Sequence, residues 1–429
     1  MRPWRMALVG LLWAGWALAA DYERDPIQYS VATPDNLASR LQKRLVAGEV
    51  TFTYDAETGY LRSLLNNLKV PLSSQTLVFS KTSLQRHKIA PRTPRALYFN
   101  DDMYIGFCKG GDVLEVSAVD PQLGTVFYTV DQDPTRKPRF TRHTDNCLLC
   151  HGSSQTQGVP GHVIRSVFSD SRGLPMLSEG TYRVDHTTPF DKRWGGWYVT
   201  GTHGKQEHLG NLLIRTPRVA RPVENAAGHN LTDLGDRFVR SGYLTPHSDI
   251  VALMVFEHQA TGHNYITRAN FETRQALHMQ ETLNREMKLP ATHEWDSTRA
   301  RIRSVGDDLV EYFLFKGEAP LTEQVRGTSG FAEEFVKRGP RDARGRSLRE
   351  FDLTRRLFRY PMSYLIYTES FDALPDRVRL YVLERLHTIL TGKDTTKRYD
   401  YLAAEDRQAI LDILVATKPN LPAYWKAGR

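Results

Sequence analysis

The residue types that could do chemistry gather at one place, Cys147-Leu148-Leu149-Cys150-His151. Two cysteines separated by two residues can bond the two vinyl groups of one porphyrin, and the histidine that follows can bind its iron as the proximal ligand. This spacing is typical of an attachment site for covalent haem c. We therefore predict that Cys147, Cys150 and His151 bind haem, with His151 on the iron.

Two other kinds of site can be built from the same segment. A Cys-x-x-Cys pair also occurs in thioredoxin-like redox proteins, but no βαβ pattern surrounds this one. A zinc ion accepts two cysteines and two histidines, here Cys147, Cys150, His143 and His151. Adjacent Cys150 and His151 would then have to share one small tetrahedron. Covalent haem is therefore the preferred interpretation.

Residues 1–20 have the pattern of a secretory signal peptide. Arg2 and Arg5 precede an apolar run, and cleavage is expected after Ala19 or Ala20. No later apolar run reaches the length of a membrane span, so the mature chain is expected to have none. We expect an exported, periplasmic protein. This agrees with the haem prediction, because bacteria attach haem to such motifs outside the cytoplasm, with the haem c maturation machinery as a partner.

The composition is that of an ordinary globular protein, with 40% hydrophobic and 25% charged residues among 429. Its formal net charge of +8 is too small and too dispersed for a nucleic-acid-binding protein, but it suits an acidic redox partner. Cys108 is interpreted as a buried free thiol, with an iron ligand or an intermolecular disulfide as the alternatives. The arginine-rich stretch 338–359 is interpreted as a solvated face, or else as a dock for an anionic partner or the haem propionates.

Hydrophobic periodicity predicts an α+β fold in which a β-rich, haem-bearing N-terminal half is covered by a helical C-terminal half. The expected regions are the signal peptide (1–20), a mixed helix and β region with the haem motif (21–215) and a mainly helical region that packs on it (216–429). Strands are expected at 96–99, 103–108, 113–119, 125–130, 162–168, 180–184, 197–201 and 209–214. Helices are expected at 37–47 and 61–68, and then at 245–287, 297–315, 329–338, 346–358, 376–390 and 403–417.

Several segments resemble a family of exported bacterial proteins, the cytochrome c domain-containing proteins. The similar segments are LVFSKTSLQRHKIAPRTPRALYFNDD, NCLLCHGSS, RWGGWYVTGTHG, HLGN and DLTRRLFRYPMSYLIYTESFDALP, and they extend over most of the mature chain. The resemblance implies haem binding and electron transfer. One position departs from the family pattern, because His-Met-Gly-Asn is replaced here by His208-Leu209-Gly210-Asn211. If that methionine is the family's iron ligand, His208 has to serve in this chain.

A haem iron with a proximal histidine has either a second protein ligand, as in electron carriers, or an open face for catalysis. His208 is the first choice for the distal ligand, since it ends a predicted turn and precedes Gly210, where a planar ring can approach the backbone. His203, Met176 and His258 compete with it, as does an empty site.

The sequence as a whole predicts an exported monohaem c-type cytochrome that carries single electrons between partners. A haem-dependent oxidoreductase of the peroxidase kind, with an open iron face, is the alternative, because the chain is far longer than an electron carrier requires. A haem-based sensor or interaction protein is the third possibility.

Overall fold

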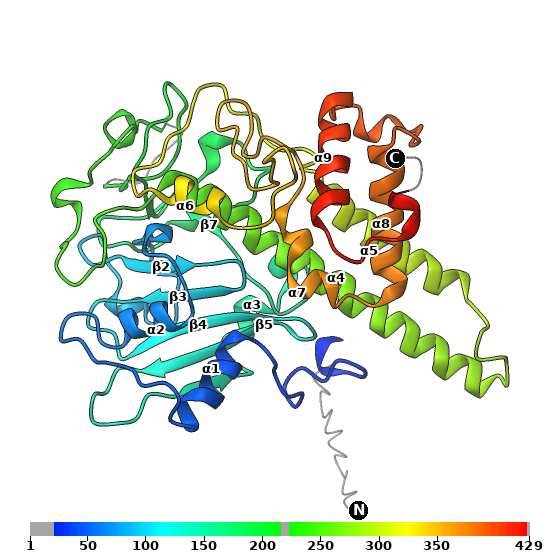
Figure 1. Cartoon of the computed structure of the whole chain (residues 1–429). Helices are drawn as coiled ribbons and strands as arrows, with labels where there is room; N and C mark the ends of the chain where they lie inside the picture. The colour runs from blue at the N-terminus through cyan, green and yellow to red at the C-terminus, as the bar shows by residue number, and fades with distance from the viewer. Residues whose placement is uncertain (1–20, 216–222, 427–429) are drawn as a thin grey trace, which may run out of the picture.

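The computed structural model describes residues 21–215 and 223–426 (Figure 1). The expected signal peptide and its cleavage after Ala19 or Ala20 therefore lie outside the described residues. Within them the fold is α+β, as predicted: the strands lie in the N-terminal half and most helices in the C-terminal half.

The N-terminal half is built on an antiparallel sheet, which has seven strands among the described residues, in the spatial order β6-β5-β4-β3-β2-β1-β9. The strands are β1 (Thr76–Val78), β2 (Arg95–Phe99), β3 (Met103–Phe107), β4 (Val113–Asp120), β5 (Gly124–Asp131), β6 (Phe140–His143) and β9 (Trp197–Tyr198). β4 and β5 pair along their whole length, from Val113 with Asp131 to Asp120 with Gly124. A separate ribbon pairs β7 (Arg165–Val167) with β8 (Thr181–Arg183).

The central strands β2 to β5 lie within one residue of their predicted bounds, because alternation and glycine turns mark them locally. The strand expected at 209–214 does not form. Instead, the side chain of Asn211 bonds the backbone N–H and carbonyl of Val199, at 2.8 and 2.9 Å. Ile214 makes only an isolated bridge to Asp170.

The helices are α1 (Leu37–Val46), α2 (Leu61–Asn67), α3 (Leu148–His151), α4 (Ile250–Glu286), α5 (Asp296–Phe313), α6 (Phe331–Lys337), α7 (Glu369–Asp372), α8 (Asp376–Leu390) and α9 (Ala404–Thr417). α4 is the longest of these described helices. Its first half is buried beside the sheet, and its second half extends away from the sheet and pairs with α5 (Figure 1). None of the described helices is long and apolar enough to cross a membrane.

The predicted start of the long helix, with Thr245 as the cap and Pro246 as the first residue, is wrong, because α4 begins after Asp249. The Asp249 carboxylate accepts two backbone N–H groups of the first turn, which is the geometry of an N-cap. The side-chain amide of Gln75 donates to the carbonyls of Thr245 and His247, at 2.8 and 2.7 Å, and holds both residues outside the helix. His247 therefore lies before the helix that carries Met254 and His258.

The helix expected at 346–358 is also absent, since this arginine-rich segment is irregular. Its arginines form ion pairs instead of a solvated helical face. The guanidinium of buried Arg349 packs on the rings of Phe335 and Tyr364. The ion pairs of the stretch are Arg338 and Arg349 with Asp101, Arg341 and Arg359 with Glu350, Arg346 with Asp342 and Asp412, Arg355 with Asp352, and Arg356 with Asp406.

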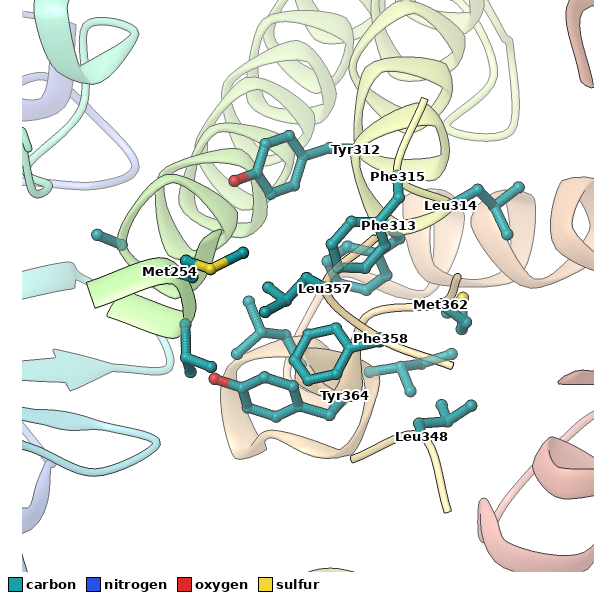
Figure 2. Packing of buried hydrophobic residues seen from close by; sticks show 14 of the residues in the cluster. Met254, Tyr312, Phe313, Leu314, Phe315, Leu348, Leu357, Phe358, Met362 and Tyr364 are labelled. Carbon is teal, nitrogen blue, oxygen red and sulfur yellow. The ribbon is translucent and has the colours of Figure 1, made fainter. Parts of the chain in front are cut away.

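One hydrophobic cluster connects the two halves of the chain. It runs from Val78 and Phe99 on the sheet through α4 to Trp425 near the C-terminus. Figure 2 shows part of it, where Tyr312 and neighbouring rings face Met254 of α4. The residues before and after position 215 thus share one core.

Candidate functional site

The predicted haem-binding segment forms a single helical turn, α3, with Cys147 at its N-cap position. Cys147 and Cys150 are three residues apart, a spacing that places two side chains on one side of a helical turn. Both thiols are free; Cys147 is half-buried and Cys150 is exposed. Leu149 between them is 79% exposed, an unusual position for a large apolar side chain. The turn therefore presents both thiols and an uncovered apolar surface.

The backbone that follows the turn determines which ring nitrogen of His151 carries the proton. Its Nδ1 lies 2.9 Å from the carbonyl oxygen of Gly161, and the N–H of Gly161 donates to the carbonyl of His151 at 2.8 Å. Because a carbonyl can only accept, Nδ1 carries the proton and Nε2 keeps its lone pair. Burial lowers the pKa of His151 and favours this neutral form. An iron ligand needs this tautomer.

Gly161 is in turn held by α4. The side chain of Asn264 accepts from the N–H of His162 at 2.9 Å and donates to its carbonyl at 2.7 Å. A Cβ atom on Gly161 would lie 2.1 Å from the Asn264 Oδ1, so any other residue at this position would have to displace the Asn264 side chain. The buried side-chain amide of Asn264 on α4 therefore holds the backbone next to the Gly161 carbonyl that orients His151.

Two aromatic rings pack beside the imidazole of His151. The rings of Phe127 and His162 lie 4.9 and 6.4 Å from its own, centre to centre. His162 is buried, contacts the ring of Tyr104 at 4.1 Å and bonds the hydroxyl of Ser117 at 2.8 Å. Sequence reasoning missed Phe127, His162 and Asn264, because no local spacing connects them with the motif.

The surroundings of the thiols do not suit the two alternative sites. Burial raises the pKa of Cys147 to about 11, whereas a redox Cys-x-x-Cys needs a thiol of lowered pKa. The Nε2 of His143 bonds the hydroxyl of Thr129 at 2.9 Å. Among the described residues, no three His, Cys, Asp or Glu side chains are placed to hold a metal ion. A haem would need only one imidazole from α3, because the porphyrin itself supplies four iron ligands.

His208, the predicted distal ligand, lies in a separate buried cluster of histidines. Its ring is 4.6 Å from that of His203, 5.0 Å from that of His229 and 5.2 Å from that of Trp194. Its Nδ1 accepts the backbone N–H of Gly210 at 3.0 Å. A neutral imidazole in this state carries its proton on Nε2, which then has no lone pair for iron. The assignment of His208 stays a prediction, and ligation would require its bond to Gly210 to break.

The competing ligands also have partners of their own. The Nε2 of His203 accepts the backbone N–H of Asn230 at 3.0 Å. Met176 packs against the small cluster formed by Phe168, Leu209 and Ile214. His258 is fully buried in the main core, where its two ring nitrogens bond His186 at 3.0 Å and Ser363 at 2.8 Å.

Cys108, the third cysteine, is a buried free thiol that is 2% exposed and directly follows β3. Burial raises the pKa of this thiol to about 12. The interpretation of Cys108 as a buried free thiol is thus confirmed, and a thiol of raised pKa is a poor nucleophile.

A pocket of about 320 Å³ adjoins the histidine cluster. His208, His229 and three carboxylates, those of Glu179, Asp191 and Glu207, are among its lining residues. As far as the described residues go, the lining contains no member of α3. The haem segment and this pocket are therefore different regions of the molecule.

Comparison with protein-family models, with curated proteins and with solved structures gave no match. The resemblance to cytochrome c domain-containing proteins accordingly stays a prediction, and the site is assigned from its own geometry.

Proposed function

We propose that this chain is an exported, periplasmic c-type cytochrome that holds one haem covalently and transfers single electrons to and from a redox partner protein. Cys147 and Cys150 are the attachment residues, and His151 is the proximal iron ligand. The observation that carries this proposal is the bond from the His151 Nδ1 to the Gly161 carbonyl, which leaves Nε2 free for iron.

The roles of the chain follow from what each residue presents. Each thiol adds across one vinyl double bond: sulfur bonds one vinyl carbon and the thiol proton goes to the other, so nothing is oxidised or reduced. His151 would hold the iron, and the rings of Phe127 and His162 would keep its imidazole in place by packing beside it. Haem supplies a one-electron change between its ferric and ferrous forms.

Covalent attachment is the direct test. The protein is secreted from a bacterium that carries the haem c maturation machinery, and its intact mass is measured. We expect the mass of the mature chain plus one haem, and absorbance that remains with the denatured polypeptide. The double variant Cys147→Ala/Cys150→Ala should lose this added mass completely. Cys108→Ala is the matched control and should retain it, because this thiol is buried away from the motif.

Removal of the colour by acid-acetone extraction would overturn covalent attachment. The ferric spectrum of the loaded protein then separates the two haem functions. A low-spin spectrum indicates two axial ligands and supports electron transfer, whereas a high-spin spectrum indicates an open face and supports the oxidoreductase alternative.

A further inference from the structure

The ribbon of β7 and β8 carries two arginines in direct opposition. Arg165 and Arg183 are paired residues in its antiparallel register, and both are exposed. Cross-strand partners have Cβ atoms about 5 Å apart, so like charges at such a pair are unfavourable. Neither guanidinium forms an ion pair with any carboxylate among the described residues. The pair is an uncompensated concentration of positive charge.

This pair lies next to the segment that follows the haem motif. The Nη1 of Arg183 donates to the carbonyl of Gln155 at 3.4 Å, and Gln155 is four residues after His151. Arg165 is held on the same ribbon by a bond of 2.8 Å to the hydroxyl of Thr181. The arginines of 338–359, which the sequence offered as an anion site, are largely occupied by carboxylates of the chain itself. Arg165 and Arg183 are therefore the better candidates for an external anion.

We propose that Arg165 and Arg183 bind the two propionate carboxylates of the haem attached at Cys147 and Cys150. Haem carries two carboxylates, and each guanidinium can form a bidentate, charge-assisted pair with one of them. Binding removes the repulsion between the arginines and ties the β7–β8 ribbon to the cofactor. The inference rests on the proposed function, since it requires the haem to be attached.

The test measures the reduction potential of the isolated, haem-loaded protein as a function of pH, after mass spectrometry has shown attachment. A nearby positive charge favours the ferrous haem, which carries one positive charge less than the ferric haem, so loss of that charge lowers the reduction potential. We expect Arg165→Gln and Arg183→Gln each to lower the potential. Both variants should also make the potential depend more strongly on pH, because a propionate without its arginine takes up a proton more readily.

Arg172→Gln is the matched control. It removes the same charge from the β7–β8 connection, but from an arginine that is exposed and paired with Asp170. Its potential should stay at the wild-type value at every pH. Arg183→Lys should restore the potential only in part, because an ammonium keeps the charge without the planar fork.

Unchanged potentials in both Arg165→Gln and Arg183→Gln would overturn the proposal. If the potentials stay constant while electron exchange with an acidic protein slows, the pair docks a partner and the propionate assignment is wrong. A chain that carries no haem at all fails the earlier mass measurement, so failure of the proposed function is recognised separately.

Discussion

His151 and His208 lie in two regions of the molecule that hold the same side chain in opposite states. His151 donates from Nδ1 to a carbonyl, which leaves the lone pair on Nε2. His208 accepts an N–H at Nδ1, which leaves the proton on Nε2. The difference lies entirely in the backbone partner, a carbonyl of Gly161 in one case and an amide of Gly210 in the other. The local backbone thus decides which histidine is prepared to bind iron.

The two regions share one support, the buried half of α4. Asn264 on this helix holds the backbone beside His151. Glu257, seven residues earlier, pairs at 3.3 Å with Arg193, next to the Trp194 that contacts His208. Seven residues are two helical turns, so the two contacts lie on one face of α4, about 10 Å apart along its axis.

The largest expected effect is on the haem spectrum. His151→Ala should abolish the proximal ligation and with it the wild-type spin state. His208→Ala should leave the spin state unchanged, because its Nε2 carries the proton, and should instead lower the free energy of unfolding by on the order of 3 kcal/mol through the cavity it leaves. Ferric and ferrous spectra of both variants measure the spin state, and denaturant titrations measure the free energy of unfolding.

A change of spin state in His208→Ala would reverse this conclusion. It would mean that His208 exchanges its bond to Gly210 for the iron, as the sequence predicted. His203→Ala controls for disturbance of the histidine cluster, since its ring lies 4.6 Å from that of His208.

The second-largest effect is on the pH dependence of protein stability, and it involves Glu257 in the buried half of α4. Burial raises the pKa of Glu257 to about 8, although Arg193 acts in the opposite direction. From about pH 4.5 to 8 the folded protein keeps a proton that the unfolded chain has released. The stabilisation from this group is therefore complete at low pH and is lost as the pH rises, by up to about 1.4 kcal/mol per pH unit. Glu257→Gln should flatten the dependence measured by denaturant unfolding.

Glu281→Gln is the control, because this glutamate lies on the exposed part of the same helix. It should leave the slope of stability against pH as in the wild type. A Glu257→Gln variant with the wild-type slope would show that Glu257 is ionised in the fold and that Arg193 outweighs burial.

The fold could be predicted where the signal is local. The bounds of α8, Asp376–Leu390, match the sequence prediction, because Pro375 precedes the helix and Val378, Val382 and Leu386 form an apolar stripe. The helix prediction for 346–358 was wrong for the opposite reason. Its conformation depends on ion pairs with residues far along the chain, such as Arg349 with Asp101, which periodicity does not report.

The site shows the same division. Cys147, Cys150 and His151 are found from their spacing alone, whereas Asn264 lies 102 residues from the His162 backbone that it holds. The His208 prediction used the neighbouring Gly210 as a sign of close approach. In the structure the Gly210 N–H donates to the His208 imidazole itself. A sequence does not show which ring nitrogen accepts this hydrogen bond.

The smallest effect is on the electronic properties of the haem ligand, and it tests whether α4 supports His151 from a distance. The Gly161 carbonyl makes the His151 imidazole more basic, which favours ferric iron. Asn264→Ala frees the backbone of His162 and should weaken this bond, so we expect the reduction potential to rise by tens of millivolts, where about 59 mV equals a tenfold change for one electron. Asn270→Ala is the matched control, since Asn270 is a buried amide on the same helix that bonds the carbonyl of Pro121 instead. Both variants should lose similar stability, but only Asn264→Ala should shift the potential. Equal shifts in the two variants would show that α4 acts through general stability and that His151 is oriented by its own turn alone.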